Sequence, residues 1–112
     1  MSASPPRTPT LAFRSGGRRW AVPVSEVREA ARVPRLTALP GSSPRCAGVA
    51  LVRGMPLAVL DVAPRRRELS ERNLVLVFES RPFALLVDAV DGVEEHGSSA
   101  TSLDLDELER ES

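Results

Sequence analysis

The sequence predicts a small, mainly β protein, and three observations support this fold class. Short apolar runs rich in Val, Leu, Ala and Phe recur along the chain, and Gly, Pro, Ser and Arg separate them as turns separate strands. A length of 112 residues with 42% apolar content suits one compact domain. No run approaches the ~20 apolar residues that a membrane helix needs.

The first predicted unit is a hairpin. Residues 11–13 and 20–24 are β-prone, and Gly16-Gly17 lies in the turn between them. Pro23 cannot donate to a ladder, so it marks an edge or a strand end. Residues 25–31 have a capping Ser, early acids and good helix formers, which predicts a short helix ended by Val33-Pro34.

A second hairpin is predicted over residues 48–62, with a turn at Arg53 and Gly54 between two apolar runs. Residues 36–40 precede it as a short extended segment. Residues 41–44 form a loop by their turn chemistry.

The second half of the chain is predicted to hold two more strands and a short helix. Residues 64–73 are a surface loop or a single helical turn, and 74–78 are apolar on both faces, as in a buried strand. Residues 83–93 then read as one long strand after the Arg81-Pro82 turn. Towards the end, Leu105 and Leu108 form one face of a short acidic helix.

The division of the chain follows its composition. We expect residues 1–9 to be a disordered Pro/Ser leader, 10–97 to form the domain, and 98–112 to be an acidic tail with a linker and a possible helix. The leader lacks the apolar core of a secretory signal, and the single cysteine, Cys46, suits a reducing compartment as a small buried residue. A cytoplasmic protein is expected.

Catalytic, metal and cofactor sites are not predicted. His96 is the only histidine and there is no Tyr or Lys, so no nucleophile and base stand together. His96 is expected to face solvent. Three carboxylates follow apolar strands: Asp61, Asp88 and Asp91. At such a position an Asp more often ends the strand pairing by bonding nearby backbone than it acts as an acid or base.

Nucleic-acid binding by a small β-barrel is the main alternative from the residues alone. Arg18, Arg19 and Trp20 form a basic cluster with an aromatic, as single-strand binders use. The phenylalanines lie in apolar strand runs, where the core needs them. The basic run 65–67 is followed by acids that would repel a polyanion.

Arg53 is the most informative charged residue, because it stands between two apolar runs. Its charge must reach a carboxylate or the surface. Two interpretations stay open: a structural salt bridge, to Glu29 or Asp61, and an anchor in a protein interface.

Four segments in order resemble the CheW-like domain, the module that couples chemoreceptors to a CheA-type histidine kinase. Residues 20–29 resemble its first hairpin and "V-x-E" segment, and 36–41 resemble "LTPLPG". Residues 48–61 resemble "GVxNLRGxVLPVxDL", and 86–90 resemble "LVDxV".

The resemblance implies two small SH3-like five-stranded barrels around a shared core, with no catalytic activity and no cofactor. It also implies an adaptor that binds the cytoplasmic tip of a chemoreceptor, and a CheA-type kinase or other CheW-like proteins, at receptor clusters in the cytoplasm. Nucleic acid and membrane insertion are not expected. By position, the protein-binding residues are Val27, Glu29, Leu36, Gly48, Arg53 and Gly54.

Two departures refine this expectation. Leu51 and Val52 precede Arg53 where the family usually has Asn before its "LRG". After Glu95 the chain lacks the loop and strand pair of a full member, and residues 103–108 resemble only its closing "LLDxxxLL" segment. The second barrel is therefore expected to be truncated, as in the small Frz-type accessory coupler of gliding bacteria. Receptor binding with weakened or absent kinase binding is expected, and a full receptor-kinase coupler stays as an alternative.

Overall fold

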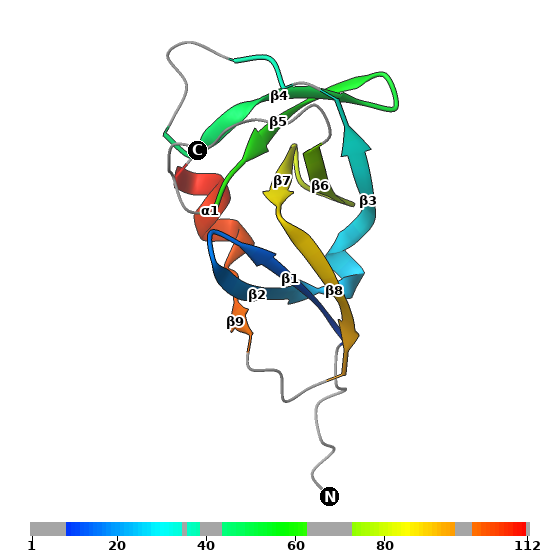
Figure 1. The fold of residues 1–112 in the computed structure, drawn as a ribbon, viewed down its shortest axis with the longest axis vertical. Coiled ribbons are helices and arrows are strands. Elements are labelled where there is room, and N and C mark those ends of the chain that lie inside the picture. Colours follow the sequence, from blue (N-terminus) through cyan, green and yellow to red (C-terminus); the bar gives the residue numbers. More distant parts are fainter. Residues whose placement is uncertain (1–8, 35, 39–43, 63–72, 96–99, 112) are drawn as a thin grey trace, which may run out of the picture.

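A computed structural model of the chain describes residues 9–34, 36–38, 44–62, 73–95 and 100–111. The predicted mainly β class is confirmed, because strands dominate this part and helices are short (Figure 1). The elements are β1 Thr10–Ser15, β2 Arg18–Pro23, the 3-10 turn η1 Val24–Glu26, β3 Val27–Val33, β4 Cys46–Val52, β5 Met55–Leu60, β6 Asn73–Phe78, β7 Phe83–Val87, β8 Ala89–Glu94, β9 Thr101–Ser102 and α1 Leu105–Glu111.

The smaller sheet has four strands in the order β8-β1-β2-β9. Its first hairpin is as predicted: Gly16 and Gly17 form the two-residue turn with φ of 65° and 78°, values that suit glycine and match strand twist. Strand β9 has only two residues and pairs in parallel with Trp20 and Ala21. Strand β8 is the opposite edge, so among the described residues this sheet does not close on itself.

The larger sheet has five strands in the order β3-β6-β7-β5-β4. Its β4–β5 hairpin is the second predicted hairpin, and Arg53 and Gly54 form its turn with φ of 51° and 78°. Neighbours pair antiparallel except β5 with β7, which run parallel. The expected buried strand over 74–78 is the greater part of β6.

Each face of the five-stranded sheet packs on a separate apolar cluster. Successive side chains of a strand point to opposite faces, so β6 and β7 supply both clusters. The first lies between the two sheets and under α1, and contains residues such as Phe13, Leu76, Leu85 and Leu105. The second fills the other face, and contains Val33, Leu36, Ala50, Val52, Val59, Val75, Val77, Ala84 and Leu86.

The predicted helix over 25–31 is wrong. Only η1 is helical, and β3 begins directly after it. Alternate side chains of β3 are exposed and partly buried, a period of two, and the strand pairs along its length with β6. Tertiary pairing has overridden the helix propensity of Glu29 and the two alanines after it.

The predicted single strand over 83–93 is two strands. The break is at Asp88, where the chain leaves the five-stranded sheet and enters the four-stranded one. At this corner the backbone N–H of Asp88 donates to the carbonyl of Arg14 (2.8 Å), and its carboxylate accepts from Gly16 N–H (3.2 Å). Asp88 thus ends the strand by bonding backbone, but the backbone is that of the distant residues Arg14 and Gly16 and not the neighbouring backbone that was predicted.

The acidic helix predicted near the C-terminus is confirmed as α1. Leu105 and Leu108 are both 3% exposed and belong to the first cluster. The Arg81 guanidinium joins α1 to the body of the protein: it bonds Asp106 (2.6 Å), Glu109 (3.2 Å) and, on η1, Glu26 (3.2 Å). The bond to Asp106 is the main reason why the pKa of Arg81 is raised.

Several predicted features lie outside the described residues: the leader over 1–8, most of the 41–44 loop, the segment 63–72 and His96. Cys46 is half-buried and packs against the first cluster, so it is less buried than predicted. Within the described ranges, no helix has the length and hydropathy needed to cross a bilayer.

Candidate protein-binding surface

Of the six residues predicted to bind a protein, three lie together at the surface and three lie partly or fully inside the fold. Glu29, Arg53 and Gly54 meet at the tip of the β4–β5 hairpin beside β3. Val27 is half-buried and packs against the first cluster. Leu36 and Gly48 contact each other on the inner side of the same hairpin.

Arg53 and Glu29 form a two-pronged ion pair. Arg53 Nε donates to Glu29 Oε2 at 2.8 Å, and Nη2 donates to Oε1 at 3.0 Å. The pair resolves which carboxylate Arg53 reaches, because Asp61 is buried elsewhere and its backbone N–H donates to the Arg45 carbonyl. The hydrogen bond from Arg53 is the main reason why the pKa of Glu29 is lowered, and the bond to Glu29 likewise raises the pKa of Arg53.

The pair is also open to solvent on the Arg53 side. The Arg53 side chain is 78% exposed, whereas that of Glu29 is 21% exposed. A positive φ at a non-glycine residue is uncommon, and Arg53 adopts it as the first residue of the two-residue turn. Glu29 therefore fixes the orientation of a cation whose outer face stays accessible to a partner.

Exposed apolar side chains flank this cation, and sequence reasoning missed them. Leu51 is 67% exposed and Met55 is 63% exposed, one on each side of the Arg53-Gly54 turn. Leu51 lies opposite Pro56, which is also exposed. For Leu51 and Pro56 the signal was available in the hairpin register, because a strand buried on one face must turn alternate residues outward. Met55 pairs with the buried Val52 and lies on the other face, at the end of the hairpin. We call Leu51, Arg53, Met55 and Pro56, with Glu29, the hairpin-tip surface.

Gly48 and Leu36 have a structural explanation. Gly48 has a φ of +148°, and a Cβ there would lie 2.8 Å from the Thr37 carbonyl oxygen and 3.1 Å from Leu36 Cβ. Thr37 makes a two-hydrogen-bond bridge with Val49 across this close approach. Leu36 is 4% exposed in the second cluster. The two residues keep the segment after β3 packed on the hairpin.

The basic cluster proposed for nucleic acid is engaged within the fold. The Arg18 guanidinium lies over the Trp20 ring at 4.9 Å, and Arg19 pairs with Asp91 (2.8 Å) and with Glu94. Arg19 is the main cause of the lowered pKa of Asp91, and Arg14 adds to it. As predicted, the phenylalanines serve the core: Phe13, Phe78 and Phe83 are at most 3% exposed. The cluster thus offers one half-buried aromatic, whose ring Arg18 covers, while two carboxylates compensate the charge of Arg19.

A metal site is absent from the part of the chain that the structure describes, where no three His, Cys, Asp or Glu side chains gather suitably. The hairpin-tip surface has a cation, its orienting carboxylate and three apolar side chains. Such a surface is suited to binding another protein, because apolar groups around an anchored Arg are typical of interfaces.

Comparison with known proteins gives matches in sequence and in structure. A family model described as the CheW-like domain matches residues 9–104. Protein PilI of Pseudomonas aeruginosa is 35% identical over an alignment of 108 residues, and the match covers 88% of this chain and 59% of that protein. The chain thus spans about three fifths of this relative.

Among solved structures, the scaffolding protein TtCheW from Thermoanaerobacter tengcongensis matches with a TM-score of 0.67 at 20% identity. The match covers 80% of this chain and 65% of that one. It confirms the predicted fold, with one sheet of five strands and a second, smaller sheet.

Proposed function

Because the chain belongs to the CheW-like domain family, we propose that it is a non-enzymatic adaptor in bacterial chemosensory signalling. In this proposal it binds the cytoplasmic tip of a methyl-accepting receptor, with weakened or absent binding of a CheA-type kinase. The proposal carries with it a cytoplasmic location at receptor clusters.

The hairpin-tip surface is the observation that supports receptor binding. Arg53 is held by Glu29 and stays 78% exposed between Leu51 and Met55. Receptor tips are helical, and a helix can lay an apolar stripe on Leu51 and Pro56, which share one face of the hairpin, while a polar or acidic group meets Arg53. A second charged group on the receptor would compete with Glu29 only in part, because the outer N–H groups of a guanidinium can bind separately.

The small extent of the four-stranded sheet supports reduced kinase binding. The four-stranded sheet ends in a strand of two residues, whereas each strand of the five-stranded sheet that carries the hairpin tip has at least five residues. A partner that needs the smaller sheet would find less surface there.

The test is calorimetric titration with a soluble receptor-tip fragment and, separately, with the kinase. We expect Arg53→Ala to weaken tip binding about tenfold or more, as removal of an interface anchor does. Arg28→Ala is the matched control, because Arg28 is also an exposed arginine near Glu29 but pairs with Glu79. It should leave tip binding unchanged.

Three results would contradict the proposal. Tight kinase binding without receptor would reverse the assigned partners, and copurification with both would indicate a full receptor-kinase coupler. Salt-dependent oligonucleotide binding that is lost on neutralising Arg18 and Arg19 would indicate a nucleic-acid binder. Melting curves of each variant separate lost binding from lost folding.

A further inference from the structure

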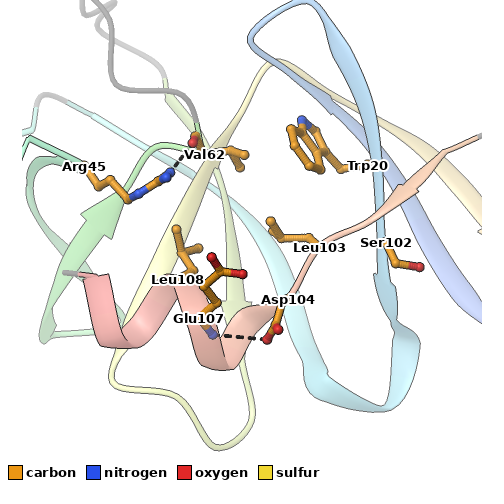
Figure 2. Close-up of a pocket in the computed structure, with 8 residues that line it drawn as sticks. All are labelled: Trp20, Arg45, Val62, Ser102, Leu103, Asp104, Glu107 and Leu108. Carbon is orange, nitrogen blue, oxygen red and sulfur yellow. Dashed lines mark hydrogen bonds between the residues drawn. The ribbon is translucent and has the colours of Figure 1, made fainter.

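A cleft lies beside α1, where Trp20 of β2 and the segment that enters the helix face Arg45 and Val62 (Figure 2). It is separate from the hairpin-tip surface, since α1 and β3 lie on opposite sides of the molecule in Figure 1. We call it the α1 cleft. Its lining residues are Trp20, Arg45, Val62, Ser102, Leu103, Asp104, Glu107 and Leu108.

The floor of the α1 cleft is apolar and well fixed. Val62 and Leu108 are buried, and Leu103 is half-buried. Trp20 is held on two sides: its indole N–H donates to the Ser15 carbonyl (3.1 Å), and Arg18 covers its ring. The floor therefore offers a flat, ordered apolar surface to an incoming side chain.

The wall formed by α1 is acidic. Figure 2 shows the Glu107 side chain pointing from the helix into the cleft between Leu108 and Leu103. Asp104 stands at the helix start and accepts from the Glu107 backbone N–H at 3.1 Å. Within the described ranges, the Glu107 carboxylate has no ion pair, because the Arg81 guanidinium is taken by Asp106 and Glu109 on another side of the helix.

Arg45 faces these acids from the opposite wall. Its guanidinium donates to the Val62 carbonyl and is thus held at that wall. Among the described residues that line the cleft, two carboxylates against one guanidinium leave one net negative charge, and that charge lies on the α1 side. The cleft combines an apolar floor with one open carboxylate at its rim.

We propose that the α1 cleft accepts an arginine or lysine side chain from a basic segment of a partner protein. Such a side chain buries its methylene stem on apolar surface while its charge stays at the edge. Here the stem would pack on Trp20 and Leu103 and the cation would reach Glu107. A purely apolar side chain would leave the Glu107 carboxylate without a charge partner, and an acidic side chain would be repelled by it. This second surface does not depend on the proposed receptor binding.

The test uses the chain's single tryptophan, whose indole N–H gives one resonance in a ¹⁵N-labelled protein. The probe is acetyl-Ala-Leu-Arg-Leu-Ala-amide, and the matched control peptide has Glu in place of Arg. We expect a saturable shift of the Trp20 indole signal with the Arg peptide and none with the Glu peptide.

Two variants locate the carboxylate. Glu107→Gln should lower the affinity of the Arg peptide about two- to fivefold, the range expected for an exposed ion pair. Glu109→Gln makes the same charge change on the same helix but outside the cleft, and should leave the affinity unchanged. The proposal is overturned by an indole signal that does not saturate, by equal binding of the Glu peptide, or by equal losses in the two variants. Melting curves check that both variants fold.

Discussion

Replacing Gly48 with Ala should destabilise the protein because the new Cβ meets backbone. It would lie 2.8 Å from the Thr37 carbonyl oxygen, at a φ of +148° that other residues rarely adopt. The backbone strain costs about 1–3 kcal/mol. Relieving the clash moves Thr37 away from Val49 and weakens two backbone hydrogen bonds of 2.8 and 2.9 Å, each worth about 1 kcal/mol. We expect a total loss of about 2–4 kcal/mol in the free energy of unfolding.

Urea unfolding measures this loss, provided that the variant and the wild type show the same dependence of the unfolding free energy on urea concentration. The melting temperature should fall by roughly 8–16 °C. Gly54→Ala is the matched control: its φ of +78° is also unfavourable for Ala, but no atom lies within 4 Å of the new Cβ. It should cost about 1 kcal/mol. A Gly48→Ala loss no larger than that of Gly54→Ala would refute the close approach as the reason for glycine at 48.

Two further predictions concern ion pairs. Arg81→Gln removes the shared partner of Asp106, Glu109 and Glu26. It should lower the free energy of unfolding by about 1 kcal/mol, and this loss should shrink in 1 M NaCl because salt screens ion pairs. Arg110→Gln, on the exposed side of α1, should have almost no effect on the free energy of unfolding. Asp91 has a pKa lowered below the ordinary value of 3.8 by Arg19, so its stabilising contribution is complete at neutral pH and is lost as the pH falls through the lowered folded-state value. Acid titration of the unfolding free energy should show a smaller loss in Asp91→Asn than in wild type, and an equal loss in both would contradict this assignment.

The hairpins were predictable because their signals are local. Gly16-Gly17 and Arg53-Gly54 supply the positive φ values that a two-residue turn needs, and apolar residues flank each turn. Strand β6 was predictable for a related reason: a strand with apolar side chains on both faces needs a core on each side, and the two clusters provide them. The helix α1 followed from Leu105 and Leu108, which both reach the first cluster.

The predictions were wrong or incomplete where contacts with residues distant in sequence determine the local structure. Residues 27–31 have helix formers, but pairing with β6 makes them a strand. Asp88 divides a continuous apolar run because it bonds Gly16, which is 72 positions away in the chain. The Arg53–Glu29 pair was one of two options until the fold brought β3 beside the β4–β5 turn. The exposure of Leu51 and Pro56 likewise depends on which face of the hairpin the sheet buries.

The affinity of a soluble receptor tip for a charge-exchanged chain tests most directly whether the hairpin-tip surface binds a partner. Arg53→Glu alone breaks the pair with Glu29, and Glu29→Arg together with Arg53→Glu restores a pair of opposite orientation. If Arg53 contacts the receptor, the double variant regains the melting temperature of wild type but still fails to bind. If the double variant binds the receptor tip as tightly as wild type, Arg53 serves only the fold, and the proposed contact is wrong.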